Sequence, residues 1–99
     1  MLQYEQWFEP RSLSEILEVE KELCDKVWYD RHMLARQKGD DKTWNPEIRK
    51  GAYKSAAKVE RRYKKENLGP WSRFEWGMIN GKLSALRWVL GEEWDMLDT

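Results

Sequence analysis

Three helix-start signals divide the chain, and this division constrains the fold more than any other feature of the sequence. The signals are two serine-to-glutamate capping boxes, Ser12 to Glu15 and Ser72 to Glu75, and the pair Asn45-Pro46. In a capping box each side chain bonds the other residue's backbone N–H, and proline fits the first helical position because no N–H is needed there. Glycines that can stop a helix follow at Gly39, Gly69 and Gly91. The sequence therefore predicts three main helices, over about 12–38, 46–67 and 72–91.

The three predicted helices differ in how much of their circumference is apolar. The first carries one apolar stripe, the second a thin stripe with several small residues, and the third is apolar nearly all round. A helix that is apolar on every side is normally buried at the centre of a protein. No segment shows the period-two alternation of a half-buried strand. We therefore expect an all-α fold, a compact single-domain bundle over 1–99 with the third helix central and ordered aromatic arms at both termini.

The length of the first helix and the tryptophan content favour self-association. A continuous helix over 12–38 would measure roughly 39 Å, which exceeds the diameter expected for a compact chain of 99 residues. Seven tryptophans add large apolar surface. We expect them to pack mainly in the core, with a stacking surface for bases or for a partner as the alternative. A homodimer with a two-fold interface accommodates these features most simply.

Charge is balanced overall but distributed unevenly along the chain. Eighteen basic and eighteen acidic residues give a formal net charge of zero, yet residues 41–70 hold nine of the bases and four of the acids. The candidate polyanion-binding residues in this segment are Arg49, Lys50, Lys54, Lys58, Arg61, Arg62 and Lys65. A basic helix over 46–66 could bind a nucleic-acid backbone with a steep salt dependence. The neutrality of the chain favours the alternative, in which these cations pair with the chain's own acids.

A narrow line along the third predicted helix lacks large apolar side chains. This candidate close-packing seam consists of Gly77, Asn80, Gly81, Ser84 and Arg87. Spacings of three and four residues place the members on one side of a helix. Small side chains on that side would allow another helix to approach closely.

No group of residues predicts a catalytic, cofactor or metal site. Four acids of the first helix share one face: Glu15, Glu18, Glu22 and Asp25. Mg²⁺ prefers oxygen ligands that converge from several directions, so a single helix face is a poor site. His32 is the only histidine, and zinc would need two ligands beyond His32 and Cys24. We expect a solvated acidic face, a surface or half-buried His32 and an inert core thiol.

Cysteine usage and hydropathy indicate a cytoplasmic protein. The single Cys24 cannot form an internal disulfide, and no charged-then-apolar signal sequence opens the chain. The longest uncharged runs are far shorter than the roughly 20 apolar residues that cross a bilayer. We therefore expect no membrane span.

The last part of the chain resembles a group of known sequences. It contains WSRFEWG at 71–77, NGKLSALRWVLG at 80–91, EWD at 93–95 and LDT at 97–99. These strings resemble the ends of small uncharacterised bacterial and bacteriophage helical proteins, and the resemblance implies no reaction, ligand or cofactor. Since no catalytic motif is present, we expect a non-enzymatic protein–protein interaction or assembly module. Nucleic-acid binding through the basic helix is the alternative, and a Mg-dependent nucleotide hydrolase ranks third.

Overall fold

The computed structural model describes residues 9–94, and these form the all-α bundle that the sequence predicts. Its elements are α2 (Leu13–Lys38), the 3₁₀ turn η1 (Asp40–Thr43), α3 (Pro46–Tyr63), the 3₁₀ turn η2 (Lys65–Asn67) and α4 (Arg73–Val89). The described residues include no strand, and none of their helices is long and apolar enough to cross a membrane. The predicted aromatic arms fall largely on residues 1–8 and 95–99, outside the described residues.

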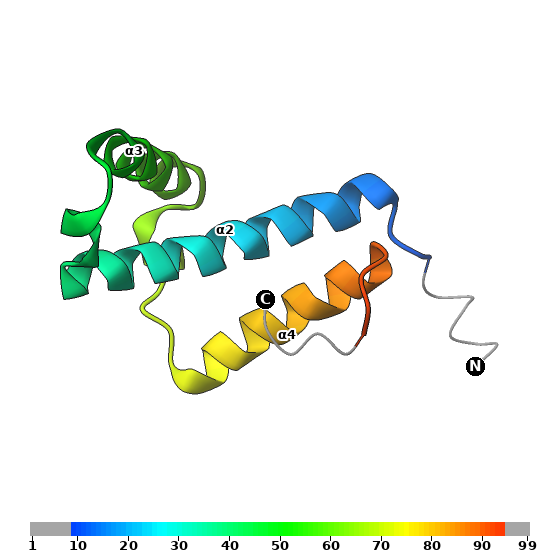
Figure 1. Ribbon diagram of the computed structural model, residues 1–99. Helices are drawn as coiled ribbons and strands as arrows, with labels where there is room; N and C mark the ends of the chain where they lie inside the picture. Colours follow the sequence, from blue (N-terminus) through cyan, green and yellow to red (C-terminus); the bar gives the residue numbers. More distant parts are fainter. Residues whose placement is uncertain (1–8, 95–99) are drawn as a thin grey trace.

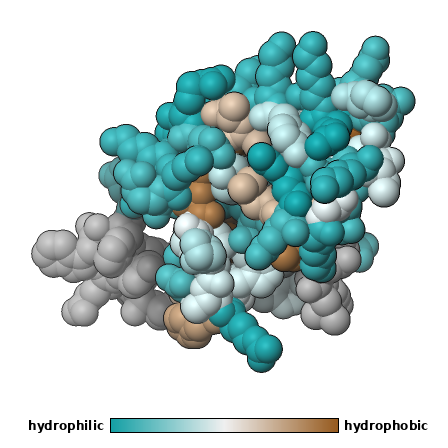
Figure 2. Space-filling model, turned by 90° about the vertical axis from the view of Figure 1, so that its left-hand side faces the viewer, coloured by the Kyte–Doolittle hydropathy of each residue, from teal (hydrophilic) through white to brown (hydrophobic). Residues whose placement is uncertain are grey.

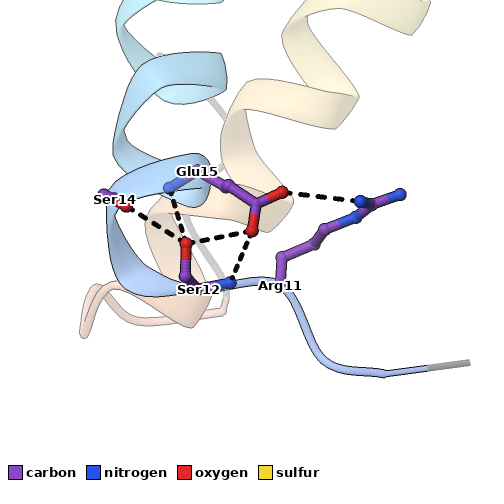
Figure 3. Close-up of polar contacts among 4 residues, drawn as sticks. All are labelled: Arg11, Ser12, Ser14 and Glu15. Carbon is purple, nitrogen blue, oxygen red and sulfur yellow. Dashed lines mark hydrogen bonds and ion pairs between the residues drawn. The ribbon is translucent and has the colours of Figure 1, made fainter.

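Local capping chemistry explains where α2 begins and ends. The Ser12 hydroxyl accepts a hydrogen bond from the Glu15 N–H at 3.2 Å, and the Glu15 carboxylate accepts one from the Ser12 N–H at 3.2 Å (Figure 3). Arg11 adds an ion pair to the same carboxylate at 3.5 Å. These hydrogen bonds from Ser12 lower the pKa of Glu15. At the other end Gly39 takes a left-handed φ of 82° and closes the helix.

The second helix is shorter than the sequence predicts. It ends at Tyr63 rather than near residue 67, because Lys64 adopts a positive φ of 66° that interrupts the helical path. Residues 65–67 then form the separate turn η2. α4 starts one residue after its capping serine, as expected, and ends at Val89, two residues before the predicted limit.

The central helix is α2, which corrects the expectation that the third helix is central. α3 and α4 each pack on α2 and share no substantial packing with each other. Figure 1 shows α4 antiparallel to α2 on one side and α3 crossing the other end of α2. The reason is that α2 is long enough for α3 and α4 to pack on different stretches of it. Among the described residues, α4 therefore has a helix neighbour on one side only, although its sequence is apolar nearly all round. Near its C-terminal end, Trp94 packs edge-on against Trp88 with 5.2 Å between the ring centroids.

Two small clusters form the core. In the first, Tyr29 of α2 packs with Ala56 and Val59 of α3 and with Leu68. In the second, Leu23 and Val27 of α2 enclose Leu83 of α4, which has no exposed surface. None of the six tryptophans among residues 9–94 is fully buried, although Trp76 is half-buried and packs against the second cluster, so the expected packing of tryptophans in the core is found only in part. Because α3 packs on α2 through small residues such as Ala56, the tryptophan rings lie at the edges of the contacts between helices.

Candidate functional site

Exposed cations line the outer side of α3. We call Lys50, Lys54, Lys58 and Arg61, with Lys65 in the following turn, the α3 stripe; all five are exposed. Their spacing of three and four residues places the four helical members within about a quarter of the helix circumference. Ala56 and Val59, which are buried against α2, lie on the opposite side. The upper part of Figure 2, over α3, is accordingly hydrophilic.

The other two predicted polyanion-binding residues are engaged within the chain. Arg49 lies 3.5 Å from the Asp41 carboxylate, and its guanidinium lies over the Tyr53 ring at 5.5 Å. Arg62 pairs with Asp25 at 3.3 Å. Within residues 9–94, no ion pair involves a member of the α3 stripe. The expected pairing with the chain's own acids therefore covers two of the seven cations here, while Asp95 and Asp98 of the tail lie outside the described residues.

The predicted seam on α4 is half-buried along one edge and exposed along the other. Asn80, Ser84 and Arg87 are half-buried, and Arg87 lies 3.7 Å from Glu20 and donates to the Cys24 sulfur at 3.2 Å. Gly77 and Gly81 are exposed, and a Cβ at either position would meet no described atom within 4 Å. The glycines therefore admit no helix of the same chain, and their role toward a second chain stays a prediction.

Apolar side chains cover the side of α4 that faces away from α2. We call this side the outer face of α4; it comprises Phe74, Gly77, Met78, Gly81, Ala85, Trp88 and Val89. Phe74 is 77% exposed, and Met78, Trp88 and Val89 are 45–53% exposed. Leu83, the most buried residue of α4, points in the opposite direction, since it is offset from the centre of this face by about half a turn. α4 is therefore apolar both where it packs and where it does not.

A buried histidine lies among three aromatic rings where α2, η1 and α3 meet. His32 is 4% exposed, so the expectation of a surface or half-buried ring is wrong. Trp28 stacks on it at 4.9 Å, Trp44 is tilted at 5.9 Å and Tyr53 presents an edge at 5.7 Å. Neither ring nitrogen has a hydrogen-bond partner among residues 9–94. Burial lowers the pKa of His32, which favours the neutral ring.

Asp41 is the second buried polar group of this region. It is 3% exposed and accepts a short hydrogen bond from the Tyr53 hydroxyl. This hydrogen bond, with the nearby Arg49 charge, lowers the pKa of Asp41. The second carboxylate oxygen, Oδ1, is buried and has no hydrogen-bond partner in the described part of the chain. Sequence reasoning did not single out Asp41, Trp44 or Tyr53 as a group.

Two hollows share Trp44 as a lining residue. The apolar hollow, of about 350 Å³, is lined chiefly by Trp28, His32, Trp44, Ile48 and Ala52. The cationic hollow, of about 410 Å³, is lined by Lys42, Trp44, Pro46, Arg49, Lys50 and Tyr53. A third hollow, of about 500 Å³, lies near η2 and mixes acids with bases, including Glu22, Lys26 and Lys64.

The acidic residues of α2 are not brought together around a common point. Asp25 accepts a hydrogen bond from the Tyr63 hydroxyl at 2.8 Å in addition to the Arg62 contact, so it connects α2 to α3. In the described part of the chain, no three His, Cys, Asp or Glu side chains are arranged to hold a metal ion. Cys24 is half-buried beside Arg87. Asp25 thus links α2 to α3, and Cys24 links α2 to α4.

No protein-family model, curated protein or solved structure matches the chain. The resemblance of residues 71–99 to bacterial and bacteriophage proteins stays a prediction. The candidate sites therefore rest on geometry and chemistry alone.

Proposed function

We propose that the chain is a protein-interaction module that assembles with a second copy of itself through the outer face of α4. The supporting observation is the exposure of that face: Phe74 is 77% exposed, and Met78, Trp88 and Val89 expose about half of their surface. An apolar helix face of this extent, lying opposite a packed face, is typical of a surface that binds another protein. Burying a side chain of this size is worth about 1.5–3 kcal/mol relative to full exposure.

The order of residues along this face suits antiparallel pairing of two copies. The two glycines and Ala85 lie toward the middle of the helix, while Phe74 and Trp88 lie near its ends. A two-fold axis beside Gly81 would place Phe74 against Trp88 of the second copy, since the two residues are equally distant from Gly81. It would also place Gly77 against Ala85. Small residues at the centre would allow close backbone approach, and the large rings would fill the ends.

Light scattering tests this assignment. At micromolar concentration we expect twice the single-chain mass of 12.0 kDa. The double variant Phe74→Ser and Met78→Ser should return the mass of one chain, because it removes apolar surface without touching the core. Val19→Ser is the matched control, since Val19 is 51% exposed on α2. A single-chain mass for the unmodified protein, or equal dissociation of the control, would overturn the proposal.

A second candidate function is nucleic-acid binding through the α3 stripe. The observation that favours it is that four exposed cations share one side of α3, a fifth follows in the next turn, and none of the five has an ion pair among residues 9–94. Such a row suits the spaced negative charges of a phosphate backbone and would give salt-dependent affinity.

Charge reversal tests the second candidate. Lys54→Glu with Lys58→Glu should abolish retardation of nucleic acid at low salt. The matched control, Arg73→Glu with Lys82→Glu, makes the same change in net charge on α4 and should retain binding. Equal losses in both variants would show that net charge, rather than the stripe, governs the interaction.

A further inference from the structure

Trp44 lines two hollows of contrasting chemistry. It lines the apolar hollow with Trp28 and Ile48, and the cationic hollow with Lys42 and Lys50. Trp44 is half-buried and follows directly after η1. A flat ring between an apolar recess and a pair of ammonium groups is chemically suited to a ligand with a flat ring and an attached anion.

His32 places a polar ring among the residues that line the apolar hollow. Its side chain is 4% exposed, and both ring nitrogens are buried without a hydrogen-bond partner among residues 9–94. A neutral imidazole has one N–H donor and one acceptor nitrogen, so it can bond to either kind of group on a ligand edge. A buried polar group without a partner is costly, which makes a ligand that supplies a hydrogen bond here favourable.

The cationic hollow continues into the α3 stripe. Lys50 lines the hollow with Lys42 and is also the first residue of the stripe, so the hollow adjoins the row of cations that continues along α3 to Lys58 and Arg61. A chain of phosphates could follow this path, whereas a lone anion would occupy only its start. The charge therefore favours a polymer over a small molecule.

We propose that the apolar hollow takes an unpaired base of a single-stranded nucleic acid. The base stacks on Trp44 with its polar edge toward His32, the adjoining phosphates lie on Lys42 and Lys50, and the strand continues along the α3 stripe. This inference rests on the second candidate function and specifies its partner. Bases in a duplex are stacked and paired, so they cannot enter the hollow, whereas an unpaired base has a free face and free edge.

Fluorescence anisotropy with a short labelled single strand and a duplex of equal length, at low salt, tests the proposal. We expect tighter binding of the single strand. Trp44→Leu should weaken single-strand binding roughly tenfold, because stacking of a base on an aromatic ring is lost. The same variant should leave duplex binding unchanged. Trp44→Phe retains a ring and should keep most of the affinity, and melting curves of both variants verify that the cluster around His32 remains folded.

The outcomes separate the base site from the stripe. Both nucleic acids could bind equally, with binding that requires Lys54 and Lys58 but is unaffected by Trp44→Leu. That result would support binding through the α3 stripe and overturn the base site. If polyglutamate displaces the strand as effectively as unlabelled strand does, with Trp44→Leu again without effect, the surface recognises acidic peptides and the base site is again overturned. If neither nucleic acid binds at low salt, both the stripe function and the base site are rejected.

Discussion

α3 and α4 both pack on α2, but they differ in the surface that they turn away from it. The side of α3 away from α2 carries the exposed lysines and arginine of the stripe, whereas that of α4 carries Phe74, Met78, Trp88 and Val89. The packed sides also differ, because α3 contributes small residues such as Ala56 and α4 contributes the fully buried Leu83. The two helices thus pack on the same helix, α2, with side chains of different size.

This difference teaches that packing on α2 does not account for the residues on either outer surface. Exposed apolar side chains on α4 add nothing to the packing on α2, and a row of like charges on α3 repels itself. A helix that only had to cover α2 would carry mixed charges on its outer side. The two proposed functions would give each surface a role, and the predictions below test them.

The largest expected effect is on the α4 side of the core. Leu83→Ala should lower the free energy of unfolding by about 2–5 kcal/mol, because Leu83 is fully buried between Leu23 and Val27 and its truncation leaves a cavity. Urea denaturation measures the change. Leu83→Met, which conserves volume, should cost less than about 1.5 kcal/mol. If Leu83→Ala lowers the free energy of unfolding by less than about 1.5 kcal/mol, α4 packs only loosely on α2.

A pH-dependent effect should arise on the α3 side, at His32. Burial lowers the pKa of the folded His32, so the unfolded chain takes up a proton more readily. The free energy of unfolding should therefore be full above the ordinary histidine pKa of about 6.5 and fall as pH drops below it, by up to about 1.4 kcal/mol per pH unit. Urea denaturation of the unmodified protein and of His32→Phe measures this slope. Because His32 is the only histidine, an equal slope in the variant would contradict the assignment.

Gly81→Ala should have opposite effects on the single chain and on its assembly. The added methyl meets no described atom within 4 Å, and alanine favours a helix over glycine by about 1 kcal/mol. The melting temperature of the single chain, measured in the Phe74→Ser and Met78→Ser background, should therefore rise. Self-association of the otherwise unmodified protein should weaken, because the methyl lies at the centre of the proposed pairing. If analytical sedimentation shows that Gly81→Ala does not change self-association, Gly81 does not lie in the interface.

The smallest effect is expected from reversing charges in the α3 stripe. Lys54→Glu with Lys58→Glu should change the free energy of unfolding by no more than about 0.5 kcal/mol per site, because both side chains are exposed and neither has an ion pair among residues 9–94. Thermal unfolding checks this. A clear fall in melting temperature would indicate that the lysines pair with acids of the chain's own tail.

Local chemistry made the helix starts predictable. Ser12, Asn45 and Ser72 each cap the helix that the sequence assigns to them, because capping depends on residues within one turn. The ends were harder to predict: Lys64 takes a positive φ that its residue type does not favour. The sequence also could not distinguish a helix buried on all sides from one with an apolar surface left exposed, so α4 was wrongly placed at the centre.

The candidate sites were predictable only where one element supplies them. The α3 stripe follows from spacing within a single helix, although the sequence could not show that Arg49 and Arg62 would be engaged by Asp41 and Asp25. The cluster around His32 depends on Trp44 from a turn and Tyr53 from another helix. Trp28 and His32, four residues apart on α2, were the one local signal of this stacking.

The placement of α3 and α4 on different stretches of α2 has a consequence for avidity. If two copies join through α4, neither α3 is covered by the contact, since α3 and α4 share no substantial packing. The pair would then present two identical binding surfaces. Once one surface engages a long strand, the second meets the same strand at a raised effective concentration, so the pair would bind far more tightly than a single copy. Separating α3 from α4 along one long helix is thus a way to make a small protein bivalent.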